Sequence, residues 1–68
     1  MNLIPVSSSN LSAVGYENGT LYVSFHNGGY YSYNNVPEYV FHELLNAPSK
    51  GVYFSENIKN SYTFTKLR

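Results

Sequence analysis

The sequence contains no cysteine and no aspartate, and only 12% of its 68 residues are charged. Without cysteine, the chain can form neither a disulfide bond nor a cysteine-based metal site. A domain of this length buries only about 60% of the surface that its unfolded chain exposes, so it needs reinforcement. Oligomerisation is the reinforcement that remains, and low charge opposes it only weakly. We therefore expect a homo-oligomer, most simply a dimer.

Balanced charge restricts the class of ligand. Four basic and four acidic side chains give a formal net charge of zero, whereas proteins that depend on phosphate contacts are normally basic. All four cations lie late in the chain, at Lys50, Lys59, Lys66 and Arg68. The sequence therefore allows a local basic patch near the C-terminal end but not a basic protein.

Long hydrophobic runs are also missing. No stretch approaches the roughly 20 apolar residues of a membrane span, and the first residues lack the basic and apolar regions of a signal peptide. The chain contains no repeat and no linker. We expect a single domain over residues 1–68, cytoplasmic and not bound to a membrane.

The residues that catalysis requires are scarce. His26 and His42 are the two histidines of the chain, and the sequence offers neither of them a cysteine or an aspartate as a catalytic partner. No pair of histidines has the spacing of metal ligands. We predict a protein that is not an enzyme, has no metal and no cofactor, and carries both histidines at its surface.

Tyrosine, in contrast, is abundant, with eight residues and no tryptophan. A tyrosine has a hydrophobic body and a polar tip, so it suits half-buried faces and interfaces. The densest run is residues 30–33, between a glycine turn and the start of a predicted helix. More tyrosine is present than a core of this size needs, which indicates a binding surface.

The first predicted hairpin is well specified. The dipeptide Asn18-Gly19 favours a type I′ turn between two alternating segments, residues 11–17 and 20–25. A two-residue turn pairs Glu17 with Thr20. This register gathers Val14, Tyr16, Leu21, Val23 and Phe25 on one face.

The second turn, at residues 27–29, allows two registers. A two-residue loop pairs Phe25 with Tyr30, and a three-residue loop pairs it with Tyr31. Because one residue of slip exchanges the faces, the shorter loop sends Tyr31 and Tyr33 to the open face. The longer loop turns both toward the core and leaves Tyr30 outside. The second glycine of the turn favours the longer loop.

Helical signals follow the tyrosine run. Asn35 can cap a helix, Pro37 tolerates its first turn, and Glu38 can complete a capping box. An apolar stripe at helical spacing comes next, formed by Val36, Val40, Phe41, Leu44 and Leu45. The predicted fold is α+β: a three-stranded antiparallel meander packed against a helix at about 36–46. A second short helix, capped by Ser49, is expected at about 50–59, and a short last strand at 62–66.

Motifs along almost the whole chain match one family. They are Ile4-Pro5-Val6-Ser7-Ser8, Ala13-Val14-Gly15-Tyr16, Leu21-x-Val23-x-Phe25, Tyr31-x-Tyr33, Val36-Pro37, Ala47-x-Ser49-x-Gly51-x-Tyr53-Phe54, Ile58 and Tyr62. On these residues the chain resembles the KTSC domain, a module found alone in bacterial and phage-type proteins and at the C-terminus of some lysyl-tRNA synthetases. Within that pattern, Tyr16, Tyr31, Tyr33 and Pro37 are expected to be structural. The association with the synthetase implies RNA binding.

The residues expected to contact a ligand are aromatic, cationic or part of a helix start. Exposed tyrosines can stack a base or fill a partner's pocket. The turn at residues 49–51 can offer backbone N–H groups and an ammonium to an anion, or it can be an ordinary helix–helix turn with a solvated lysine. The complete set is Tyr22, Tyr30, Ser49, Lys50, Gly51, Tyr53, Lys66 and Arg68.

Two functions are therefore predicted. The first is a small non-catalytic module that binds RNA or a nucleotide-like ligand, and the zero net charge fits a small nucleotide better than a duplex. The alternative is a self-assembling or protein–protein interaction module with an aromatic interface and no nucleic-acid ligand. In either case two copies can frame a cleft, so we expect a ligand site at or beside a subunit interface.

Overall fold

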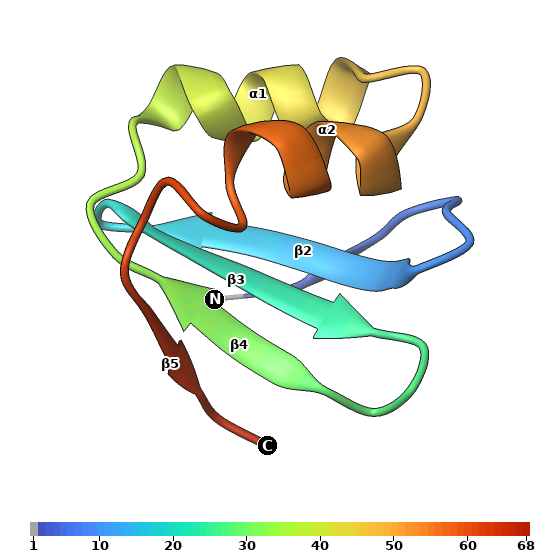
Figure 1. Ribbon diagram of the computed structural model, residues 1–68, viewed down its shortest axis with the longest axis horizontal. Coiled ribbons are helices and arrows are strands. Elements are labelled where there is room, and N and C mark those ends of the chain that lie inside the picture. The colour runs from blue at the N-terminus through green and yellow to red at the C-terminus, as the bar shows by residue number, and fades with distance from the viewer. Residues whose placement is uncertain (1) are drawn as a thin grey trace.

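The computed structural model describes residues 2–68, which form one antiparallel sheet with two helices on the same face (Figure 1). Its strands follow the chain order β1-β2-β3-β4-β5, so each strand pairs with its neighbour in sequence. The strands are β1 (Ile4–Pro5), β2 (Leu11–Glu17), β3 (Thr20–Phe25), β4 (Tyr30–Tyr33) and β5 (Phe64–Lys66), and the helices are α1 (Glu38–Asn46) and α2 (Lys50–Asn57). The predicted α+β class and the order of the elements from β2 to β5 are confirmed, whereas β1 and its pairing with β2 were not predicted.

The hairpin of β2 and β3 has the predicted register. Glu17 pairs with Thr20 across the turn, and Val14 pairs with Val23. Asn18 and Gly19 have φ values of 52° and 80°, which is the positive-φ pair that a type I′ turn requires. The local sequence therefore determines this part of the sheet.

The hairpin of β3 and β4 has a register that neither predicted loop gives. Its three-residue loop is residues 26–28, and the Phe25 N–H donates to the Gly29 carbonyl at 2.8 Å. Val23, rather than Phe25, therefore pairs with Tyr31. The Asn27 side chain accepts a hydrogen bond from the Gly29 N–H at 2.9 Å, a local turn that closes the loop one residue earlier than expected.

The tyrosines nevertheless lie on the faces of the sheet that the register of the longer loop predicts. The observed pairing differs from that register by two residues, and a shift of two leaves every side chain on its original face. Tyr31 and Tyr33 consequently lie on the helix-covered side with Val23, while Tyr30 lies on the open side beside Tyr22.

The start of α1 differs from the predicted capping box. Pro37 is the N-cap residue, with no side-chain capping bond, and α1 begins at Glu38. Asn35 has a φ of 57°, so it turns the chain before the helix rather than capping it. The Val36 N–H donates to the Gly19 carbonyl at 2.8 Å. This long-range hydrogen bond holds the segment before α1 against the turn of the first hairpin. A capping motif, which involves only neighbouring residues, cannot predict it.

The start of α2 is as predicted. The Ser49 hydroxyl accepts a hydrogen bond from the Val52 N–H at 3.4 Å. The helix ends at Asn57 with Ile58 as its C-cap, two residues before the expected end. The last strand begins at Phe64 rather than at Tyr62.

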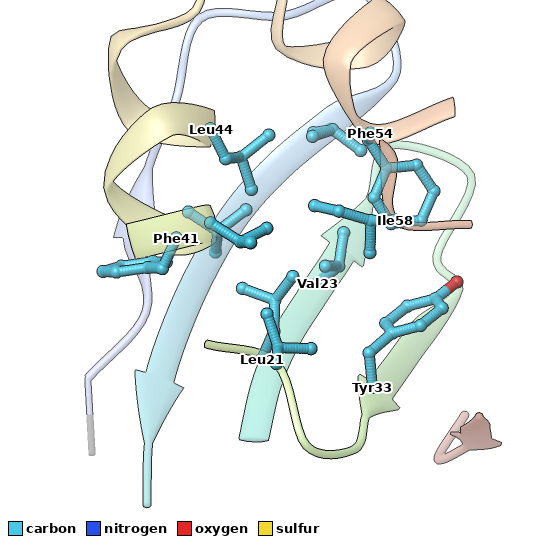
Figure 2. Close-up of a cluster of buried hydrophobic side chains, with 11 residues drawn as sticks. Leu21, Val23, Tyr33, Phe41, Leu44, Phe54 and Ile58 are labelled. Carbon is cyan, nitrogen blue, oxygen red and sulfur yellow. The ribbon is translucent and has the colours of Figure 1, made fainter. Parts of the chain in front are cut away.

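The core lies between the sheet and the two helices (Figure 2). The expected stripe of α1 is confirmed, since Val40, Phe41 and Leu44 are buried. Phe54 and Ile58 bring α2 to the same core. The buried hydrophobic residues are Leu11, Val14, Leu21, Val23, Tyr33, Val36, Val40, Phe41, Leu44, Phe54 and Ile58.

Candidate ligand-binding cleft

A cleft of about 930 Å³ opens on the helix side of the sheet, at the end where β3 turns into β4. Its walls come from four segments that are distant in sequence: residues 9–11, the hairpin at 25–31, α2 with the turn after it, and β5. The volume is within the range of small-molecule sites. Strand pairing brings β5 to this place, and core packing brings α2.

Aromatic rings form the floor of the cleft. Phe25 meets Tyr31 edge to face with ring centroids 5.6 Å apart, and it meets Phe54 of α2 at 5.5 Å. Tyr33 meets Phe54 at 5.3 Å. Such edge-to-face contacts stabilise aromatic clusters beyond the area that they bury. The rings therefore form one packed surface that joins α2 to the sheet.

Phe64 extends this surface to the mouth of the cleft. It lies opposite Tyr33 in the β4–β5 pairing, and its ring is 5.8 Å from the rings of both Tyr31 and Tyr33. Its exposed fraction is 56%, which is high for a phenylalanine. The face of an aromatic ring is thus available to a ligand.

The charge around the cleft is of one sign. Lys59, Lys66 and Arg68 line it, and none of the four glutamates does. His26 also lies at the rim, where its Nε2 is 2.9 Å from the Ser8 carbonyl oxygen. A protein of zero net charge thus has a site at which three of its four cations gather, which favours an anionic ligand.

The Tyr33 hydroxyl belongs to the cleft. Burial and the neighbouring Tyr31 raise the pKa of Tyr33 above its ordinary value, so the group is a neutral donor and acceptor. No hydrogen bond ties this hydroxyl to another group within residues 2–68, and no side-chain polar atom there is both fully buried and without a partner. Although the side chain is only 4% exposed, its hydroxyl therefore reaches solvent through the cleft.

Three of the residues expected to bind a ligand meet on the opposite face. The rings of Tyr22 and Tyr30 lie 6.3 Å apart, and the Arg68 guanidinium carbon is 5.8 Å from the Tyr30 ring centroid, within cation–π distance. Both tyrosines are half-buried rather than exposed as expected. Their neighbours Gly15 and Ser32 are buried although they face away from the helices, which indicates that the rings cover them.

The turn before α2 borders the cleft only through Gly51. Lys50 donates from Nζ to the Ala47 carbonyl at 3.3 Å and is half-buried. Gly51 is buried, and a Cβ at this position would come within 3.3 Å of the Asn10 side-chain nitrogen. These contacts favour the helix–helix turn over an anion site. A second hollow of about 350 Å³ lies here, beside Ser49.

Tyr53 connects the two helices. Its hydroxyl donates to Glu43 Oε1 of α1 at 2.6 Å. Burial, this hydrogen bond and the Glu43 charge raise the pKa of Tyr53 to about 12. Tyr53, which was expected to contact a ligand, thus already donates its hydroxyl proton to a hydrogen bond within the protein.

Tyr16 packs between β2 and α1. Its ring stacks on Phe41 with centroids 5.4 Å apart, and its hydroxyl donates to the Val36 carbonyl at 2.5 Å. It joins β2 to α1 at the end of the sheet away from the cleft.

The expected ligand residues therefore lie in three places. Gly51, Lys66 and Arg68 line the cleft. Tyr22 and Tyr30 lie on the open face, where the Arg68 guanidinium packs on Tyr30, and Ser49, Lys50 and Tyr53 lie in or directly before α2, outside the cleft. Sequence reasoning missed the cleft residues Phe25, Phe54, Phe64 and Lys59. One signal was available, because Phe64 and Lys66 alternate in a strand and must share a face. No local signal places α2 opposite that strand.

The two histidines remain apart. His42 lies on α1, 3.5 Å from Glu38, and both side chains are more than half exposed. His26 is at the hairpin end. In residues 2–68 no cluster of three histidine or acidic side chains could hold a metal ion, and no helix there is long and apolar enough to cross a membrane.

A five-stranded antiparallel sheet with two helices on one face and a cleft at one end defines a small α+β domain with a cleft of ligand size. The chain belongs to the KTSC domain family, whose model matches residues 7–62. It is similar to the crystal structure of a KTSC domain protein from Yersinia pestis, with a TM-score of 0.95 and 35% identity over 98% of this chain and 97% of that one.

Curated relatives are much longer proteins. The chain is 40% identical over 67 residues to the lysine–tRNA ligase of a Nostoc species, which covers 96% of this chain and 12% of the ligase. It is 44% identical over 48 residues to the lysine–tRNA ligase of Nostoc punctiforme, covering 71% of this chain and 9% of that protein. The similarity is thus to one small part of each ligase.

Proposed function

We propose that this chain is a non-catalytic binding module that holds RNA or a nucleotide-like ligand in the aromatic cleft. The observation that carries the proposal is the combination of an aromatic floor with three cationic side chains and no glutamate, in a chain whose net charge is zero. Aromatic rings stack on bases, and lysine and arginine contact phosphates. The cytoplasmic setting expected from the sequence is part of the proposal.

Two further observations support a nucleotide-like ligand. The Tyr33 hydroxyl opens into the cleft without a partner in residues 2–68, so it can bond to the polar edge of a base. The similar lysine–tRNA ligases act, by their name, with a tRNA, so a domain that contacts RNA would serve them. The few cations imply that stacking supplies much of the affinity.

Fluorescence-anisotropy titration with a labelled single-stranded RNA tests the proposal. Phe64→Leu and Lys66→Gln should each weaken binding, by about tenfold for the loss of one stacked base and by less for one phosphate contact. The matched controls are Tyr39→Leu, an exposed aromatic on α1, and Lys50→Gln, a cation outside the cleft. Unchanged affinity in both cleft variants would refute the cleft as the site.

The salt dependence gives a second test. With three cations at the site, the logarithm of the association constant should fall against the logarithm of salt concentration with a slope of about −2. A slope near zero would mean that phosphates are not contacted. The Lys66→Gln variant should make the slope shallower, whereas Lys50→Gln should leave it unchanged.

Self-association is a second candidate function, supported by the free edge of β5. This strand is last in the sheet order, and the exposed hydrophobic residues Phe64 and Leu67 lie in it and directly after it. Edge strands can pair with a second copy, although Lys66 and the short length of β5 oppose this. Light scattering over a concentration series, with Leu67→Ser as the variant, tests the expected dimer: the variant should reduce association, and unchanged association would refute the β5 edge as the contact.

A further inference from the structure

The sheet carries two aromatic surfaces, one on each face, and β4 contributes to both. Tyr31 lies in the cleft and Tyr30 lies beside Tyr22 on the open face, because consecutive residues of a strand point to opposite sides. Building on the function proposed above, we propose that these surfaces form one track for a single strand of RNA, which leaves the cleft, passes around the β5 edge and reaches the Tyr22–Tyr30 pair.

The barrier between the two surfaces is narrow. Only β5 separates β4 from the edge of the sheet, and adjacent strands lie about 4.8 Å apart. All three residues of β5 are exposed, and within residues 2–68 no further strand pairs with it. A flexible chain can therefore pass from one face to the other around this edge.

Arg68 occupies the position where the two surfaces meet. Its backbone is paired with Tyr30, because the Tyr30 N–H donates to the Arg68 carbonyl and the Arg68 N–H donates to the Tyr30 carbonyl, both at 3.1 Å. The residue lines the cleft, and its guanidinium carbon lies 5.8 Å from the Tyr30 ring centroid. A positive charge is thus fixed at the turn that the strand would make, with Lys66 preceding it on the cleft side.

The arrangement selects for a single strand of several nucleotides. A duplex keeps its bases stacked on one another, so their faces are not available to Phe64 or to Tyr30. A mononucleotide can occupy only one of the two surfaces at a time. A longer strand can occupy both, and the second contact then forms intramolecularly and raises the affinity.

A length series of uridine oligoribonucleotides, from the dinucleotide to the octamer, tests this track. We expect the octamer to bind at least about tenfold more tightly than the dinucleotide. Tyr30→Leu should weaken octamer binding by about tenfold and leave dinucleotide binding unchanged, whereas Phe64→Leu should weaken both. Tyr39→Leu is the matched control and should affect neither.

NMR spectroscopy of the unmodified protein gives an independent test that does not depend on the folding of a variant. The octamer should shift the ring resonances of both Phe64 and Tyr22, while the dinucleotide should shift only those of Phe64. If Tyr22 does not respond to the octamer, or if the dinucleotide binds as tightly as the octamer, the track is refuted while binding in the cleft stands. If no RNA of any length binds at micromolar concentration, the proposed function itself is refuted.

Discussion

The two faces of the sheet use the same residue type in different ways. On the helix-covered face, Tyr31 and Tyr33 join a cluster with Phe54 of α2 and form the floor of a cleft. On the open face, Tyr22 and Tyr30 cover two small residues and meet one arginine. The difference shows that the elements packed against a tyrosine, rather than the tyrosine itself, decide whether it serves the core or a surface.

Truncating a side chain on each face of β3 should give the largest contrast in stability. Leu21 is fully buried on the helix side, so Leu21→Ala should lower the free energy of unfolding by about 3 kcal/mol. The adjacent Thr20 faces the open side and is half-exposed, so Thr20→Ala should cost less than about 1 kcal/mol. Urea denaturation followed by circular dichroism measures both, and equal costs would contradict the assignment of the core.

Replacing a positive-φ glycine in the second hairpin should lower the free energy of unfolding by less than Leu21→Ala does. Gly28 has a φ of 94°, a conformation that side chains with a Cβ rarely adopt, so Gly28→Ala should destabilise the domain by about 1 kcal/mol. Nothing lies within 4 Å of the added Cβ, so the backbone alone accounts for the cost. If thermal unfolding shows no loss of stability, the loop at residues 26–28 is different from the one described.

Removing one hydroxyl from each face compares hydrogen bonding on the two sides. Tyr16→Phe deletes the bond to the Val36 carbonyl and should cost about 1 kcal/mol. Tyr22 has no such bond within residues 2–68, so Tyr22→Phe should be close to neutral. Equal values in chemical denaturation would mean that the Tyr16 bond contributes nothing.

Raising the pH should give the smallest effect, because Tyr53 is partly exposed and solvent screens its bond to Glu43. The pKa of Tyr53 is raised to about 12, so the folded protein holds this proton more tightly than the unfolded chain, whose tyrosine has an ordinary value of 10.0. The contribution to stability is complete below pH 10 and is lost as the pH rises toward 12. Tyr53→Phe should therefore lose less stability than the unmodified protein between these values. An identical pH profile would contradict the raised pKa.

The parts of the fold that were predicted correctly depend on neighbours in sequence. Asn18-Gly19 selects its turn by backbone conformation, and the alternation of residues 20–25 assigns their faces. The register of the second hairpin was not predicted, because the Asn27 side chain accepts a hydrogen bond from the Gly29 N–H and the loop begins one residue earlier. The predicted start of α1 was wrong for a different reason, since the Val36 N–H donates to the carbonyl of Gly19, which is distant in sequence.

The candidate site was less predictable than the fold. Lys66 and Arg68 were expected to meet a ligand, but Phe54 was known only as a helix residue and Phe64 only as a strand residue. Their combination into one surface requires α2 to pack over the β3–β4 hairpin and β5 to pair with β4. Contacts of this kind join segments separated by many residues, and propensity or periodicity carries no information about them.

Local signals predict the α+β class, the first hairpin, the apolar stripe of α1 and the cap of α2, because turn preference, side-chain alternation and helical periodicity act over a few residues. Long-range packing, in contrast, places the tyrosines that line the cleft, gathers the cations around it and positions Arg68 between the two faces. These outcomes depend on the packing of α2 and the pairing of β5, whose free energy comes from burying surfaces that are remote in the chain.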